Sequence, residues 1–119
     1  MPFPTRTALF ALAGILATTA AAPAMAEGPA ISTKWLDLTV TQDVCLSKAE
    51  AAIKIAGFDN PEKTQQSRYG TIDGYTGAVR CISDKAIVMF VVSGPNRGTA
   101  ERASMELFKA FVGREAMAR

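Results

Sequence analysis

Two cysteines, Cys45 and Cys81, are the residues of this sequence whose types are best suited to chemistry. In a small exported protein such a pair most often forms a structural disulfide, whereas a redox pair usually has the C-x-x-C spacing. A thiol in the first turn of a helix is more reactive than an ordinary one, and Cys45 lies in such a turn. We expect a disulfide and keep redox chemistry as an alternative.

The sequence contains no histidine. Histidine is the usual general base beside a serine or cysteine nucleophile, and it is also the commonest metal ligand. Its absence excludes most familiar hydrolase and metal-site designs. We therefore expect no catalytic residues, no metal site and no cofactor.

Three carboxylates, Asp37, Glu62 and Asp73, could act as acid and base, but nothing in the sequence places two of them together. Tyr75 and Arg80 lie on one expected strand with opposite parity, so we expect them to face different sides of the sheet. Each of these residues is typical of a solvated loop or a half-exposed strand.

The segment SGPNRG, residues 93–98, precedes an expected helix. Free backbone amides and the helix dipole attract anions there, and Arg97 could assist in binding a phosphate. The segment lacks both the Walker lysine-serine pair and the Rossmann glycine spacing. It predicts a plain turn from a strand to a helix.

Residues 1–26 have the features of a secretory signal peptide: Arg6, an apolar stretch at 8–22, and the cleavage motif Ala24-Met25-Ala26. The apolar stretch is short and rich in Ala and Thr, whereas a membrane span needs about 20 predominantly apolar residues. An uncleaved anchor is the alternative. We expect a periplasmic or secreted mature chain, residues 27–119, without a stable membrane anchor.

A chain of this size forms a single domain near the lower limit at which one core suffices, so a covalent staple would help. The formal net charge is only +2. The charged residues of both signs are scattered along the chain, whereas proteins that bind nucleic acid carry clustered Lys and Arg. We expect no nucleic-acid partner.

The sequence of the first half of the domain predicts a strand followed by a helix. Residues 33–40 alternate between apolar and polar, which is typical of a half-buried strand. Residues 42–56 have one apolar helical face. Thr41 is the expected N-cap, and Gly57 the left-handed residue after the helix, with Phe58 contacting Ile53.

The middle of the domain is harder to interpret. Residues 59–68 are polar throughout and predict a solvated loop. Residues 69–72 form either a separate strand or the start of the next one, and we favour a bulge at Asp73-Gly74 over a tight turn. Gly70, Gly74 and Gly77 indicate a close approach to the backbone by a helix or a ligand.

The longest β-branched and aromatic run predicts a hairpin of residues 75–82 and 86–92 around the turn Ser83-Asp84-Lys85. Residues 86–92 are apolar at both parities, which is typical of a central strand covered on both faces. A helix follows at 99–112, and Gly113 ends it.

These elements predict an α+β fold in the order β-α-β-β-α. A right-handed crossover gives a three-stranded antiparallel sheet, order 1-3-2, with two helices on one face. The arrangement resembles a ferredoxin-like fold that lacks its last strand, a likeness of architecture alone. It also brings Cys45 and Cys81 to one end of the sheet, where a disulfide would close a loop of about 36 residues and stabilise by roughly 3 to 4 kcal/mol.

Two helices on one face leave Trp35, Ala78 and Ile82 uncovered as an interaction surface. A second copy of the chain is the simplest partner, then a periplasmic protein, then a small apolar ligand. The sequence therefore predicts a small exported, disulfide-stabilised module that acts by binding or association. The alternative is a small redox or hydrolytic enzyme that uses Cys45 and Cys81 or the Asp73/Tyr75 region.

Overall fold

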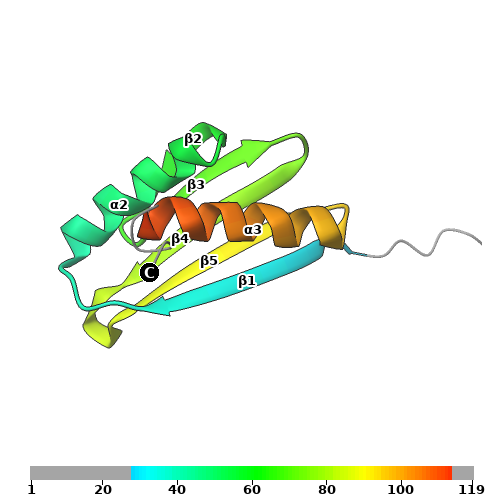
Figure 1. Ribbon diagram of the computed structural model, residues 1–119. Coiled ribbons are helices and arrows are strands. Elements are labelled where there is room, and N and C mark those ends of the chain that lie inside the picture. Colours follow the sequence, from blue (N-terminus) through cyan, green and yellow to red (C-terminus); the bar gives the residue numbers. More distant parts are fainter. Residues whose placement is uncertain (1–27, 114–119) are drawn as a thin grey trace, which may run out of the picture.

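The computed structural model describes residues 28–113, so the signal peptide expected at 1–26 lies outside the described residues. Within these residues the fold consists of a five-stranded sheet and two α-helices (Figure 1). The elements are β1 (Ala30–Asp37), α2 (Gln42–Ile55), β2 (Asp59–Lys63), β3 (Ser67–Ile72), β4 (Tyr75–Ile82), the short 3₁₀-helix η2 (Ser83–Lys85), β5 (Ile87–Gly94) and α3 (Arg97–Val112).

The strands lie in the order β1-β5-β4-β3-β2, and every neighbouring pair is antiparallel. Both helices lie on the same face of the sheet (Figure 1). The first, α2, packs on β3 and β4, and α3 packs on β1 and β5 as well as on α2. The result is a two-layer α+β fold in which the helices cover one face.

The expected three-stranded sheet is wrong, and so is its likeness to a shortened ferredoxin-like fold. The three expected strands are neighbours in the order β1-β5-β4, but β3 and β2 extend the sheet beyond β4. The segment expected to be a solvated loop contains β2, whose residues are all exposed. Its Pro61 is compatible with a strand only because β2 is at the edge of the sheet, where a missing backbone donor breaks no ladder.

A tight turn, and not the bulge that we favoured, joins β3 to β4. Asp73 and Gly74 both have left-handed backbones, with φ of 47° and 83°. Ile72 and Tyr75 on either side are paired across the two strands. Two consecutive residues with positive φ are the geometry of a two-residue hairpin whose twist matches the strands.

The ends of α2 follow the sequence expectations. The Thr41 hydroxyl accepts a hydrogen bond from the Val44 amide at 3.2 Å. At the other end Gly57 has φ of 89°, and the Phe58 amide donates to the Ile53 carbonyl at 3.0 Å. This is the Schellman ending, which requires a residue that adopts the left-handed region without strain.

The second helix, α3, begins two residues earlier than expected. Its N-cap is Asn96, whose side-chain oxygen accepts from the Thr99 amide at 2.9 Å. An asparagine in this position satisfies one of the amides that the first turn leaves free. Gly113, with φ of 87°, ends the helix as expected.

Phe90 on β5 lies at the centre of the core. The rings of Phe108 and Phe111 meet its ring edge-on, with centroids 5.4 and 5.3 Å away. Such edge-to-face contacts add to the stabilisation from burial alone. The helix-facing residues of β4 and β5 around it are buried: Val79, Cys81, Val88 and Val92.

The predicted disulfide joins Cys45 to Cys81, with 6.0 Å between the Cα atoms. It connects the first turn of α2 to the end of β4, 36 positions later in the chain. Gln42 reinforces this junction, because its side-chain amide donates to the Cys81 carbonyl at 2.9 Å. One covalent bond thus fixes where α2 begins over the sheet.

Two of the three glycines that indicated a close approach do make room for a side chain. A Cβ on Gly70 or on Gly77 would come within 2.6 Å of Phe58. The ring of Phe58 therefore lies directly on the backbone of β4 at Gly77, and its Cβ lies on the backbone of β3 at Gly70. Gly74 has no such neighbour and serves the hairpin turn instead.

We expect that replacing both Cys45 and Cys81 with serine lowers the free energy of unfolding by about 3 kcal/mol, because the unfolded chain regains the entropy of the closed loop. The melting temperature should fall by more than about 10 °C. Thermal unfolding followed by circular dichroism measures this shift. An unchanged melting temperature would show that the disulfide contributes nothing to stability.

We expect Gly77→Ala to destabilise the fold by about 1–3 kcal/mol, because the added methyl group overlaps the Phe58 ring. Gly28→Ala is the control, since nothing lies within 4 Å of a Cβ at that position. Urea denaturation of both variants gives the comparison. Combining Gly77→Ala with Phe58→Leu should recover part of the loss, and equal stability of Gly77→Ala and the wild type would refute the contact.

Candidate functional site: the open face of the sheet

The side chains of the sheet that point away from α2 and α3 form a continuous surface, here called the open face. Strand alternation and the pairing register define it, because residues paired across strands point to the same side. None of the elements within residues 28–113 covers it. The open face consists of Ile31, Thr33, Trp35 and Asp37 of β1, Ile87, Met89, Val91 and Ser93 of β5, Thr76, Ala78, Arg80 and Ile82 of β4, and Tyr69 and Thr71 of β3.

The border of the open face along β1 carries its two most exposed large apolar side chains. Trp35 is 73% exposed and Ile31 is 54% exposed. Trp35 is paired with Met89 of β5, which lies half-buried beside it. The apolar surface therefore runs from the edge strand onto the centre of the sheet.

The three residues expected to form an interaction surface all lie on the open face. Ala78 is paired with Val91, and Ile82 with Ile87, so β5 lies between them and Trp35. Both are half-buried by these neighbours, whereas Trp35 is exposed. Ile31 was not predicted to be part of this surface because the strand was expected to begin at residue 33, although Ile31 continues the same alternation.

The open face has about the area of the largest patch on a typical monomer, although polar side chains such as Asp37 and Arg80 share it. Its three longest strands, β1, β5 and β4, have eight residues each. At about 3.3 Å per residue and 4.8 Å per strand they present roughly 400 Å² in projection. The largest apolar patch on a typical monomer is about 300–600 Å² and often functional. This size makes the open face the main candidate for a binding site.

The disulfide gives little support to the redox alternative. Cys45 and Cys81 are each only 1% exposed, and the described residues include no free cysteine. A redox-active pair has to be reached by its substrate thiol, which an exposed position permits and a buried one does not. The geometry is that of a structural bridge.

The candidate carboxylates are far apart. Asp37 is at the end of β1 and Glu62 is in β2, so they belong to the two opposite edges of the sheet. Four strand spacings put about 19 Å between these edges, too far for an acid and a base to share a substrate bond. Asp73 lies in the turn between β3 and β4. Among the described residues, no group of three or more His, Cys, Asp and Glu could hold a metal ion.

Tyr75 and Arg80 face opposite sides of the sheet, as their parity predicts. Tyr75 is buried on the helix side, where its hydroxyl accepts a hydrogen bond from the Asn96 amide at 3.1 Å. Arg80 lies on the open face and donates to the side chain of Gln66. Tyr75 therefore ties the start of α3 to the sheet, which is a structural role.

The turn before α3 has few free groups for a phosphate. The Asn96 amide donates to Tyr75, and the Thr99 amide donates to Asn96. The guanidinium of Arg97 donates to the carbonyl of Ile31 at 3.3 Å. These contacts use groups that an anion would need, so the segment is a capped turn from a strand to a helix.

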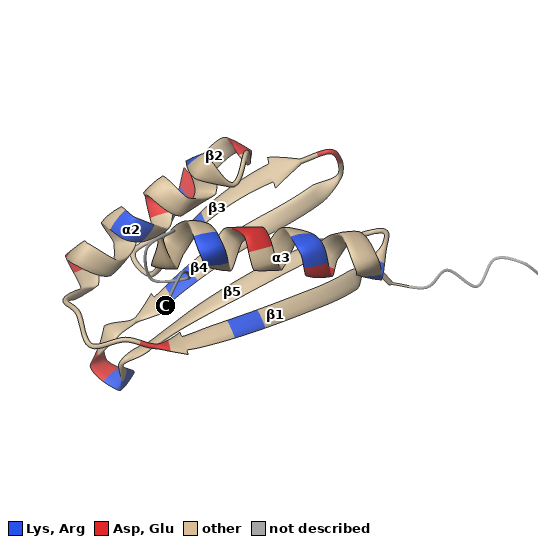
Figure 2. Cartoon of the chain, in the orientation of Figure 1, with Lys and Arg blue, Asp and Glu red and all other residues tan. Residues whose placement is uncertain are grey.

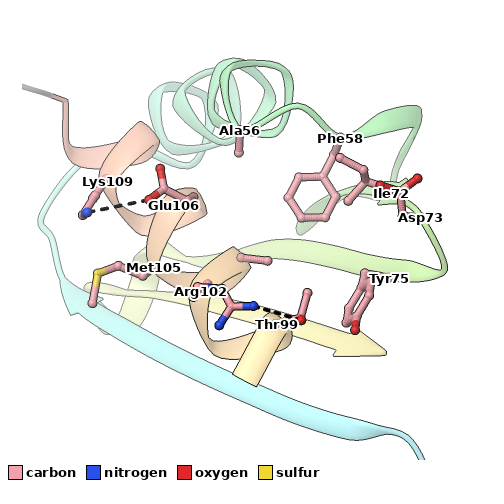
Figure 3. Close-up of a pocket in the computed structure, with 11 residues that line it drawn as sticks. Ala56, Phe58, Ile72, Asp73, Tyr75, Thr99, Arg102, Met105, Glu106 and Lys109 are labelled. Carbon is pink, nitrogen blue, oxygen red and sulfur yellow. Dashed lines mark hydrogen bonds and ion pairs between the residues drawn. The ribbon is translucent and has the colours of Figure 1, made fainter. Parts of the chain in front are cut away.

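A groove of about 570 Å³ opens on the helix side, between the end of α2, the β3–β4 turn and α3 (Figure 3). The Phe58 ring points into it, and the polar side chains on its rim contact each other. Arg102 donates to the Thr99 hydroxyl at 3.2 Å, and Lys109 lies 3.7 Å from Glu106. The groove was not anticipated from the sequence, because it forms between elements that are distant along the chain.

The charged residues are mixed on the helical side of the molecule. Figure 2 shows Lys and Arg interspersed with Asp and Glu along α2 and α3. Alternating signs do not build the single-sign field that draws polyanions to a surface. None of the helices within the described part of the chain is long and apolar enough to cross a membrane.

Comparisons with protein-family models, with curated proteins and with solved structures find no match to this chain. The function must therefore be inferred from the chain's own surfaces and contacts. The candidate surfaces on the described residues include the groove on the helix side and the open face. The open face carries the most exposed large apolar side chain, Trp35, together with Ile31, whereas Val44 and Ile55 are exposed on α2.

Proposed function

We propose that this protein is a small exported module, stapled by the Cys45–Cys81 disulfide, that acts by association with another polypeptide through its open face. The exposure of Trp35 at the border of an apolar sheet face carries the proposal. Burial of apolar surface stabilises association by roughly 25 cal/mol per Å², less the entropy lost on binding. A second copy of the chain is the simplest partner, because it is present wherever the protein is exported.

Export is supported by two independent features. Disulfides form and persist in oxidising compartments, and the fold contains one between Cys45 and Cys81. The sequence of residues 1–26 has the charge, apolar stretch and cleavage motif of a signal peptide. Both features support a periplasmic or secreted location.

The geometry favours association over the enzymatic alternative. Catalysis needs a nucleophile or base within hydrogen-bond reach of a partner group and open to substrate. The cysteines are buried in a disulfide, and the Tyr75 hydroxyl is occupied by a backbone amide. Asp73 is placed by a turn, with no second carboxylate beside it on the same hairpin tip. No observation favours a reaction at these positions.

Trp35→Glu tests the proposal. We expect the wild-type mature protein to sediment as a dimer at micromolar concentration and Trp35→Glu to sediment as a folded monomer, because a carboxylate at the border of the open face would be desolvated on association. Ser47→Glu is the matched control, since it adds the same charge on the exposed side of α2. Circular dichroism checks that both variants are folded.

Sedimentation and Trp35 fluorescence of the wild type also give the result that would contradict the proposal. If the wild type sediments as a monomer at about 100 μM and the Trp35 fluorescence is that of a fully hydrated indole, self-association is refuted. Ser47→Glu should leave both the sedimentation and the fluorescence of the wild type unchanged.

A further inference from the structure

The two edges of the sheet differ in how well they resist pairing with another strand. The edge strand β2 has five exposed residues, a proline at position 61 and a register irregularity between Asp59 and Glu62. Short length, proline and bulges are the features by which natural sheets protect an edge. The other edge strand, β1, has eight residues in unbroken register with β5. It lacks those three protections.

Alternate residues of β1 direct their backbone groups to the free edge. The Leu38 amide, directly after β1, donates to Ala86, on the side of β5. Since successive residues of a strand point their N–H and C=O groups to opposite sides, the odd-numbered residues of β1 point outward. A second contact agrees, because the carbonyl of Ile31 accepts a hydrogen bond from the exposed side chain of Arg97 at 3.3 Å. The outward-pointing residues are Ile31, Thr33, Trp35 and Asp37.

We propose that two copies of this protein pair antiparallel through β1, about a two-fold axis at Thr33, so that Trp35 of each copy packs on Ile31 of the other. The inference rests on the proposed self-association and specifies that the border of the open face along β1, and not its centre, makes the contact. In this register the outward groups of Ile31, Thr33 and Trp35 meet those of the second copy. The paired strands would exchange about six backbone hydrogen bonds. The two sheets become one continuous sheet with its open faces on the same side.

Cross-strand pairing selects this register over its neighbours. Centring the axis on Thr33 places Trp35 opposite Ile31 and Thr33 opposite Thr33, and aromatic–β-branched and Thr–Thr pairs are favourable. Lys34 then lies opposite Ser32. Centring the axis on Lys34 would place two lysines directly opposite each other and Ile31 opposite Asp37. Like charges opposite each other destabilise a sheet, so this neighbouring register is disfavoured.

The register also explains the exposure of β1. Ile31 and Trp35 are on the same face of the same strand, four residues apart, and each would cover the other across the axis. The Ile31 carbonyl has a second lone pair, so it can accept from the second copy while it accepts from Arg97. A self-complementary strand of this kind is what a two-fold interface requires.

Thr33→Pro tests the pairing at its centre. Proline removes the outward Thr33 amide of each copy and no hydrogen bond of the β1–β5 ladder, because the amide points to the free edge. We expect the dissociation constant of the dimer to rise about 30-fold or more through the loss of two hydrogen bonds. Thr33→Val is the matched control, since it retains the amide and a β-branched side chain, and it should dimerise like the wild type.

Thr33→Cys provides a second test that does not depend on stability. Residues directly opposite in a hydrogen-bonded antiparallel pair have Cα atoms about 5.5 Å apart, within the range that a disulfide spans. Under mild oxidation Thr33→Cys should form a covalent dimer on a non-reducing gel. Thr39→Cys, an exposed position beyond the end of β1, should remain monomeric on the gel.

Ile82→Glu separates the pairing of β1 edges from a dimer packed face to face, because Ile82 lies on the open face but on β4. A dimer that Thr33→Pro weakens and Ile82→Glu leaves intact supports edge pairing. If Ile82→Glu dissociates the dimer while Thr33→Pro leaves it intact and Thr33→Cys fails to cross-link, edge pairing is overturned and association through the open face stands. A wild type that is monomeric, with Thr33→Cys that fails to cross-link, overturns both.

Discussion

The packing of both helices on one face of the sheet is the constraint on which the rest of the structure depends. The chain places α2 between β1 and β2 and α3 after β5, and the Cys45–Cys81 disulfide fixes the first turn of α2 over the end of β4. Glycines in β3 and β4 make room for Phe58, which follows α2: its ring lies on Gly77 and its Cβ lies on Gly70. Nothing within the described residues is left to cover the opposite face, which makes an apolar sheet surface a consequence of the fold.

Strong local signals made part of the fold predictable from the sequence. The Schellman ending at Gly57 depends on a left-handed glycine followed by an apolar residue, and both are visible in the chain. The central position of β5 was predicted from residues that are apolar at both parities, but within the described residues only its helix-facing side is covered. The pairing of Cys45 with Cys81 was predicted because the sequence has only two cysteines and its first 26 residues resemble a signal peptide. The exposure of Trp35 followed from its parity in β1.

The parts of the fold that were not predicted have no local signal in the sequence. Every residue of β2 is exposed, so the segment has no apolar alternation, and its strand conformation comes from backbone pairing with β3. The register of β3 is set in turn by β4 and by the turn at Asp73 and Gly74. The groove beside Phe58 and the free edge of β1 depend on which elements are neighbours in space. A sequence pattern reports burial along one element, and it cannot report an edge that is defined by the absence of a neighbouring strand.

Hydrogen exchange of the β1 amides tests the central claim most directly. The amides of Thr33 and Trp35 point away from β5 and are protected only if another strand lies on them, whereas the amides of Lys34 and Leu36 belong to the β1–β5 ladder. Pairing of two copies predicts that Thr33 and Trp35 exchange slowly at high protein concentration and become fast on dilution, while Lys34 and Leu36 stay slow at both. Fast exchange of Thr33 and Trp35 at every concentration would contradict the claim, because the edge of β1 would then be open to water.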